Sequence, residues 1–152
     1  MGTYIRCKNS RRSELDTRKA ETSLNFIHSF GTDKSAKIID IGSGDSKLID
    51  FLLEEAYENV SVLDISANSL ERAKNRLGNK AEKVTWIVAD ITEFKPTEQY
   101  DIWHDRAVFH FLTEENDIKK YQNLVSKAVK GKMVIGTFST NGPLKRSDLE
   151  IK

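Results

Sequence analysis

Three aspartates, each at the end of an apolar run, are the residues of this chain best placed to do chemistry. Asp40 lies just before the glycine turn 42–44, and Asp64 and Asp90 end two further apolar runs. Glycine lets a backbone turn sharply and approach a ligand closely, and carboxylates accept hydrogen bonds from hydroxyl and amino groups. Carboxylates that meet at the carboxyl edge of a parallel sheet are typical of a nucleotide pocket.

The charges around the glycine turn indicate which nucleotide to expect. Asp64 follows Gly42 at roughly the 20-residue offset at which an acid reaches a ribose diol, so an adenosine-like ligand is expected. Asp40 and Asp45 flank the turn, and each close carboxylate would repel a pyrophosphate charge by about 1–4 kcal/mol. Lys47 stands where the dinucleotide pattern has its third glycine. The turn is therefore predicted to hold a cationic adenosine derivative, with a dinucleotide-dependent oxidoreductase as the disfavoured alternative.

Alternating strands and helices must position these residues. The predicted strands are 38–41, 60–63, 84–89, 101–104 and Met133–Phe138, and the predicted helices are 47–56, 67–77 and 114–129, after one or two helices within 13–30. Ser66 is a predicted helix cap and Gly78 a predicted helix stop. Strands that alternate with helices indicate parallel pairing. The predicted fold is therefore α/β, a doubly wound Rossmann-like parallel sheet of about five strands, with a flexible segment 1–11 and a single domain 12–152.

The composition excludes several classes of protein. The chain has 152 residues, of which 38% are hydrophobic and 31% charged, with a net charge of +1, so neither disorder nor polyanion binding is indicated. Its apolar runs are strand-sized, so no membrane span is expected, and its start does not resemble a secretory signal. The single cysteine, Cys7, fits a cytoplasmic location. The three histidines lack two-ligand spacing, so no metal site is expected.

The order of the motifs resembles a known family. The segments IIDIGSGDSKLIDFLL, VSVLDIS, VTWIVADIT and YDIWHDRAVFHFL are similar to successive motifs of class I S-adenosylmethionine-dependent methyltransferases, over roughly residues 22–152. The run WHDRAVFHFL is especially similar to a group of small bacterial-type methyltransferases. The resemblance implies that the chain binds S-adenosylmethionine and transfers its methyl group to an acceptor, a small molecule or a protein, which leaves S-adenosylhomocysteine.

The resemblance also implies a role for individual positions. Asp40 would hold the methionine ammonium, Asp64 both ribose hydroxyls, and Asp90 the adenine amino group. The residues implied to bind the cofactor are Asp40, Gly42, Ser43, Gly44, Asp64, Ile65, Asp90, Ile91, His104 and Asp105. A general base is needed only if the nucleophile arrives protonated, and its candidates are Asp105, His104 and His110. The alternative for His104, Asp105 and Arg106 is an internal hydrogen-bond cluster that fixes the turn after the fourth strand, and for His110 it is a packed ring.

The chain departs from the family pattern at both ends. Methyltransferases of this class have seven strands, whereas residues 139–152 resemble only the start of the loop toward the last two. The segment before residue 22 also lacks an aromatic pair that would close over the donor. The acceptor pocket is therefore expected to be open or missing, and a truncated S-adenosylmethionine-binding domain without methyl transfer stays open as an alternative. The fifth strand would leave an apolar edge, which predicts a homo-oligomer through it. Nucleic acid and membrane are not expected partners.

Overall fold

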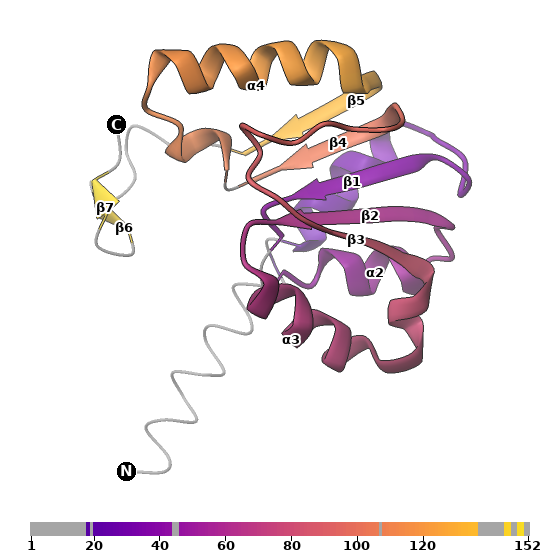
Figure 1. Cartoon of the computed structure of the whole chain (residues 1–152). Helices are drawn as coiled ribbons and strands as arrows, with labels where there is room; N and C mark the ends of the chain where they lie inside the picture. Colours follow the sequence, from indigo (N-terminus) through magenta and orange to yellow (C-terminus); the bar gives the residue numbers. More distant parts are fainter. Residues whose placement is uncertain are drawn as a thin grey trace, which may run out of the picture.

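A five-stranded parallel sheet forms the centre of the computed structural model, which describes residues 18, 20–43, 46–106, 108–136, 145–146 and 149–150. The strands of the sheet are β1 (Lys37–Ile41), β2 (Asn59–Asp64), β3 (Val84–Val88), β4 (Tyr100–Asp105) and β5 (Val129–Ile135). Their order is β3-β2-β1-β4-β5, with every neighbouring pair parallel (Figure 1). The order reverses beside β1, which is where an open α/β sheet forms its ligand crevice. The predicted doubly wound α/β fold is confirmed.

Helices cover both faces of the sheet. They are a first helix over residues 20–29, α2 (Leu48–Glu54), α3 (Ala67–Leu77) and α4 (Glu115–Ala128), with 3-10 turns η1 (Gly78–Lys83) and η2 (Phe109–Phe111). In Figure 1, α4 lies on one side of the sheet, and α2 and α3 lie on the other. Outside this sheet, β6 (Lys145–Arg146) and β7 (Leu149–Glu150) form an antiparallel pair of their own.

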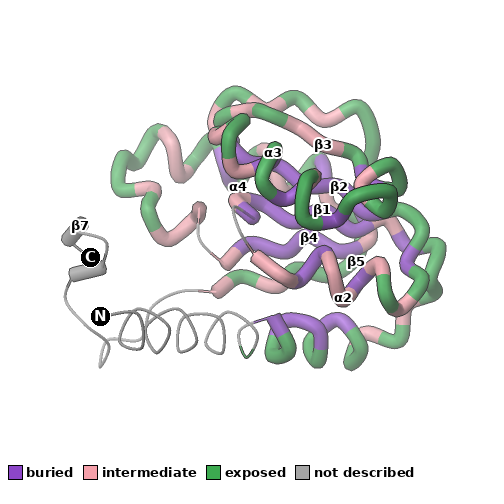
Figure 2. Tube along the Cα trace, turned by 90° about the horizontal axis from the view of Figure 1, so that it is seen from below, coloured by how far each residue is buried: buried purple, intermediate pink, exposed green. Residues whose placement is uncertain are grey.

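Alternation along the strands divides the core into two layers. Successive side chains of a strand point to opposite faces, so Ile38 packs with the first helix, α2 and α3, whereas Ile39 packs with α4. The same alternation places Ile102 in the first layer and Trp103 in the second. Figure 2 shows buried residues along β1, β2 and β4. This division determines which helix each polar side chain at the strand ends can reach.

The helix α3 has the bounds and the caps that its sequence predicts. Ser66 has extended backbone angles, and its side chain accepts a hydrogen bond from the Ser69 N–H. Gly78 ends the helix with a φ of +59°, in the left-handed region that glycine adopts without strain. The chain then continues as the 3-10 turn η1, which the sequence did not predict, before it enters β3.

The start of the fifth strand differs from the prediction. The strand begins at Val129, directly after α4, rather than at Met133, and residues 137–138 of the predicted strand lie outside the described part. The missed segment contains Lys130 and Lys132, whose side chains are exposed. An edge strand needs only backbone pairing on one side, so its beginning does not require an apolar run. The register also shifts beside Gly131, which lies directly against the Asp101 carbonyl.

Within the described residues, no helix combines the length and the hydropathy that crossing a bilayer requires.

Candidate functional site

The carboxyl edge of the sheet brings together the ends of β1, β2 and β3. Asp40 lies near the end of β1, Asp64 is the last residue of β2, and Asp90 follows β3. The turn after β1 is fixed to β2, because the Gly42 N–H donates to the Leu63 carbonyl over 2.7 Å. Gly42 has a φ of +64°, which only glycine adopts readily. The edge therefore has a backbone turn and carboxylates side by side, as the sequence predicts.

Two buried polar atoms at this edge lack partners among the described residues. Asp40 is 2% exposed and Ser43 is 9% exposed. Asp40 Oδ1 is hydrogen-bonded to His104 Nδ1 over 2.7 Å, whereas no described group satisfies Asp40 Oδ2 or Ser43 Oγ. A buried polar atom left without a hydrogen bond costs about 1–3 kcal/mol, and a ligand that donates to these atoms would remove that cost. Gly44 and Asp45 lie outside the described part of the chain.

The end of β2 combines a carboxylate with an exposed apolar side chain. Asp64 Oδ1 accepts from the Ser66 N–H over 2.8 Å, which shapes the turn into α3. Ile65 is 69% exposed, and Val88 at the end of β3 is 57% exposed. Large apolar side chains are usually covered, so their exposure at this edge fits contact with an apolar ring. Val88 is absent from the predicted site because nothing distinguishes it from other strand residues in the sequence.

Asp90 and Ile91 lie in the turn after β3. Asp90 Oδ1 accepts from the N–H and from the hydroxyl of Thr92, over 2.9 and 2.8 Å. These two hydrogen bonds hold the pKa of Asp90 below its ordinary value. The Asp90 side chain is exposed, so it remains accessible to a ligand, whereas Ile91 is 5% exposed and packs into the core layer under α4.

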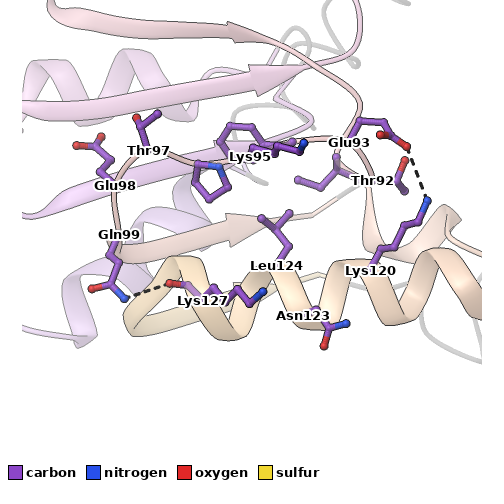
Figure 3. A pocket seen from close by; sticks show the side chains of 13 residues that line it. Thr92, Glu93, Lys95, Thr97, Glu98, Gln99, Lys120, Asn123, Leu124 and Lys127 are labelled. Atoms are coloured by element: carbon purple, nitrogen blue, oxygen red, sulfur yellow. Dashed lines mark hydrogen bonds and ion pairs between the residues drawn. The ribbon is translucent and has the colours of Figure 1, made fainter.

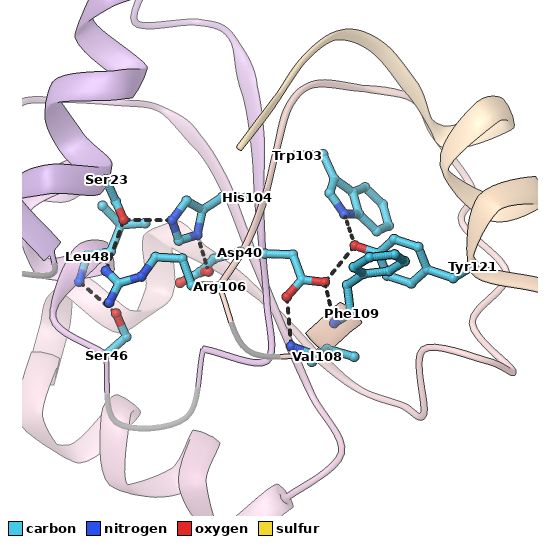
Figure 4. A network of polar contacts seen from close by, with 11 residues as sticks. Ser23, Asp40, Ser46, Leu48, Trp103, His104, Arg106, Val108, Phe109 and Tyr121 are labelled. Atoms are coloured by element: carbon cyan, nitrogen blue, oxygen red, sulfur yellow. Dashed lines mark hydrogen bonds and ion pairs between the residues drawn. The ribbon is translucent and has the colours of Figure 1, made fainter. Parts of the chain in front are cut away.

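The end of β4 supplies a polar network on the face of the first helix (Figure 4). His104 is the register partner of Asp40 on the neighbouring strand. Its Nδ1 contacts Asp40 Oδ1, and its Nε2 lies 2.9 Å from Ser23 Oγ. Arg106 Nη1 donates to the same hydroxyl over 3.0 Å. Ser23 lies far from the motifs in sequence, and no spacing signal could have placed it in the site.

Asp105 points to the opposite face and fixes the turn after β4. Its Oδ1 accepts from the Val108 N–H over 2.8 Å, and its Oδ2 accepts from the Phe109 N–H over 3.0 Å. The Tyr121 hydroxyl donates to Oδ2 over 2.6 Å and accepts from Trp103 Nε1 over 3.0 Å. Burial, then the Asp105 charge, raise the pKa of Tyr121 well above its ordinary range, so it stays a donor. This geometry favours the internal cluster, the alternative stated above, over proton transfer by Asp105.

His110, the third candidate base, lies in η2. Its ring packs against the edge of Phe111, with the ring centroids 5.6 Å apart and the planes at 87°. The side chain is partly buried. A base must lie within hydrogen-bond reach of the proton that it removes. Without an acceptor molecule, the packed ring supports the structural alternative, and a catalytic role for His110 stays a prediction.

A groove of about 590 Å³ lies away from these strand ends, between the connection after β3 and α4 (Figure 3). The groove shares only Ile91 with the predicted site, and neither Asp40 nor Asp64 lines it. At one end of the groove Gln99 donates to the Lys127 carbonyl, and at the other end Lys120 pairs with Glu93. The groove is therefore a surface feature beside the candidate site rather than the site itself.

Comparisons with known proteins identify the family. A family model described as "Methyltransferase domain" matches residues 38–131. The chain is 28% identical over 106 residues to malonyl-[acyl-carrier protein] O-methyltransferase 2 of Ilyobacter polytropus, covering 69% of this chain and 39% of that protein. It is 35% identical over 83 residues to trans-aconitate 2-methyltransferase of Rhizobium etli, covering 54% and 31%. The chain thus spans less than half the length of these curated relatives.

Solved structures share the fold. The glycopeptide N-methyltransferase MtfA superposes with a TM-score of 0.65 at 18% identity, over 76% of this chain and 52% of that one. An S-adenosylmethionine-dependent methyltransferase from Clostridium acetobutylicum superposes with a TM-score of 0.66 at 18% identity, over 76% and 48%. The matched family segment runs from β1 into β5 and takes up more than half of the chain. We conclude that this chain belongs to the methyltransferase-domain family and has its Rossmann-like fold.

Proposed function

We propose that this chain binds S-adenosylmethionine at the carboxyl edge of β1, β2 and β3 and transfers its methyl group to an acceptor. The observation that carries the proposal is the buried Asp40 Oδ2, which has no hydrogen-bond partner among the described residues. A buried carboxylate oxygen of this kind favours a ligand that brings a cationic donor. S-adenosylmethionine carries an ammonium group, and when bound it supplies an activated methyl group.

The residues at this edge divide the recognition of the cofactor between them. Asp40 accepts from the ammonium and Ser43 offers a hydroxyl beside it, while the turn at Gly42 lets the backbone approach closely. Asp64 accepts from the ribose hydroxyls, and the exposed Ile65 covers one side of the adenine. Asp90, beyond β3, faces the adenine amino group, and the backbone at His104 and Asp105 lines the methyl-donor end.

The relatives support the cofactor and leave the acceptor class broad. Structures of MtfA are described with S-adenosylmethionine, S-adenosylhomocysteine or sinefungin bound. The names of the relatives include malonyl-[acyl-carrier protein] O-methyltransferase 2, trans-aconitate 2-methyltransferase and N-terminal Xaa-Pro-Lys N-methyltransferase 1 of Xenopus tropicalis. The acceptors in these names include a small molecule and proteins. We therefore propose a methyl acceptor that is a small molecule or a protein.

The substitution Asp40→Asn tests the central contact. It keeps an oxygen for His104 Nδ1 and turns the ligand-facing oxygen into an NH₂ donor, which cannot accept from an ammonium. We expect the affinity for S-adenosylhomocysteine to fall by at least about tenfold, since a charge-assisted hydrogen bond is replaced by a repulsive contact. Asp50→Asn is the matched control, because Asp50 lies on α2, pairs with Arg76 of α3 and has no place in the proposed site. Equal affinities of the two variants would refute the role of Asp40.

A second variant tests the ribose contact. Asp64→Ala removes the carboxylate proposed to accept from both ribose hydroxyls, so we expect cofactor binding to be lost while the far-ultraviolet circular dichroism stays unchanged. An unchanged affinity would contradict this assignment. Loss of the folded spectrum would show that Asp64 acts mainly in folding, where its Oδ1 accepts from the Ser66 N–H.

Methyl transfer by this chain is separable from cofactor binding. Release of S-adenosylhomocysteine in the presence of a panel of small-molecule and peptide acceptors would demonstrate transfer. Tight cofactor binding without turnover on any acceptor would favour the alternative, a binding domain that holds the cofactor without transferring its methyl group.

We also propose self-association through the edge of β5. Within the described residues this strand pairs with β4 alone, and Met133 and Ile135 are 37% and 39% exposed. An open edge with apolar side chains tends to pair with another chain. We expect light scattering to show a dimer that dissociates in Met133→Lys, whereas a monomer at high protein concentration would contradict the proposal.

A further inference from the structure

Hydrogen bonds connect four polar side chains in a row, from Arg106, just after β4, to Asp40 in the candidate site; we call this row the hydrogen-bond chain. Arg106 Nη1 donates to Ser23 Oγ over 3.0 Å, Ser23 Oγ lies 2.9 Å from His104 Nε2, and His104 Nδ1 lies 2.7 Å from Asp40 Oδ1. Ser23, His104 and Asp40 are each 2% exposed. Bulk water therefore does not complete the contacts among these three buried groups, and the direction of their hydrogen bonds follows from which atoms can donate and which can accept.

The guanidinium of Arg106 determines which atom donates and which accepts at each step of the hydrogen-bond chain. A guanidinium only donates, so Ser23 Oγ must accept from it. The hydroxyl hydrogen of Ser23 is then available for the next group, His104 Nε2. If Nε2 accepts that hydrogen, the single proton of a neutral imidazole is on Nδ1 and is donated to Asp40 Oδ1. All the donors of the chain then point toward Asp40.

The other protonation states of His104 fit the arrangement less well. An imidazolium would place a second cation one hydroxyl away from Arg106, in a buried region where like charges repel strongly. It would also neutralise Asp40, which would weaken the attraction for a cationic ligand. A neutral ring with its proton on Nε2 would leave two unprotonated atoms, Nδ1 and Asp40 Oδ1, facing each other at 2.7 Å. That contact is unfavourable because neither atom donates.

We propose that Arg106, Ser23 and His104 are positioning residues that hold the Asp40 carboxylate with Oδ1 occupied by a donated hydrogen bond and Oδ2 directed to the ligand as an acceptor. This inference rests on the proposed function, because it explains how the carboxylate is prepared for the cofactor ammonium. It also links the helix over residues 20–29 to the cofactor site, since Ser23 is the member of the chain that this helix supplies. Figure 4 shows Ser23, His104 and Arg106 on one side and Trp103, Phe109 and Tyr121, which surround Asp105, on the other.

The test is the tautomer of His104, read from the ¹⁵N shifts of the imidazole in the full chain at pH 7 without ligand. The two ring nitrogens have distinct shifts when protonated and unprotonated. His104→Gln identifies the His104 signals against those of the other two histidines. We expect a neutral ring with the proton on Nδ1. A proton on Nε2 alone, or an imidazolium, would overturn the inference, and this measurement requires no variant of Ser23.

Ser23→Ala and Ser29→Ala form a matched pair on the same helix. Ser29 donates to the Phe26 carbonyl of its own helix and takes no part in the hydrogen-bond chain from Arg106 to Asp40. We expect Ser23→Ala to give a mixture of His104 tautomers and about a tenfold weaker affinity for S-adenosylhomocysteine. Ser23→Thr should restore the single tautomer and the affinity, whereas Ser29→Ala should leave the tautomer and the affinity unchanged. An unchanged tautomer in Ser23→Ala would overturn the inference.

The outcomes separate this inference from the proposed function. Binding of S-adenosylhomocysteine by a protein whose His104 carries its proton on Nε2 would leave the proposed function standing and overturn the inference. The expected tautomer without any binding of S-adenosylhomocysteine or S-adenosylmethionine would overturn the proposed function, and with it the purpose assigned to the chain of hydrogen bonds.

Discussion

The Tyr121 hydroxyl is a buried junction whose removal should be costly. The substitution Tyr121→Phe removes the donor to Asp105 Oδ2 at 2.6 Å and the acceptor for Trp103 Nε1 at 3.0 Å. A hydrogen bond to a charged group contributes about 1.5–3 kcal/mol, and a buried donor left unsatisfied costs about 1–3 kcal/mol. Asp105 is 0% exposed, but in the variant its carboxylate still accepts hydrogen bonds from the Val108 and Phe109 N–H groups. We therefore expect a loss near the lower end of the combined range, about 3 kcal/mol.

Urea unfolding measures this loss directly. The midpoint should fall while the dependence of the unfolding free energy on urea stays the same, because the surface exposed on unfolding hardly changes. The melting temperature should fall by on the order of 10 °C for a domain of this size.

Tyr57→Phe is the matched control for this experiment. The Tyr57 ring is also buried and lies under the Lys34 ammonium, 4.0 Å from its centroid, but its hydroxyl has no hydrogen bond to another described residue. We expect this control to change the stability by no more than about 0.5 kcal/mol. If Tyr121→Phe cost no more than Tyr57→Phe, the assignment of Asp105 to a buried cluster that fixes the turn after β4 would be refuted.

Three further perturbations test the local arguments. Thr92→Val should raise the Asp90 pKa only part of the way toward 3.8, because the Thr92 hydroxyl is lost but the N–H donor remains. A carboxylate with a lowered pKa stabilises the fold at pH values above its ordinary pKa, and this contribution is lost as the pH falls through the native pKa, so the variant should lose less stability in acid. An unchanged Asp90 titration by NMR would contradict this. Gly131→Ala should destabilise the protein by more than about 2 kcal/mol in urea, because its Cβ would overlap the Asp101 carbonyl; a neutral result would show that β5 shifts freely. Ser66→Ala should cost about 1 kcal/mol through the lost helix cap, and thermal unfolding at the wild-type temperature would disprove that contribution.

The central strands and α3 could be predicted because their physics is local. The inner residues of β1 and β2 are buried on both faces, so these strands are mostly apolar in sequence. Ser66 and Gly78 mark the ends of α3 by their own chemistry. The glycine turn could be located for the same reason, since Gly42 requires a positive φ. Short-range sequence signals were therefore sufficient for the fold and for the carboxylates at the strand ends.

The remaining features depend on tertiary contacts that the sequence does not state. The pairing of Asp40 with His104 follows from the register of β1 and β4, which requires the strand order. Ser23 joins the site only because the first helix packs on that face. The beginning of β5 is exposed and rich in lysine, so no apolar run marked it. Strand alternation alone predicts that His104 and Asp105 point to opposite faces of the sheet. It does not predict which side chains they contact there.

Titration calorimetry on the whole chain with S-adenosylhomocysteine, S-adenosylmethionine and NAD tests most directly the claim that the carboxyl edge of β1 to β3 is an S-adenosylmethionine site. We expect binding of the first two ligands with a Kd of about 10 μM or tighter, near −7 kcal/mol, and no heat of binding with NAD. Binding of NAD without any response to S-adenosylhomocysteine or S-adenosylmethionine would contradict it.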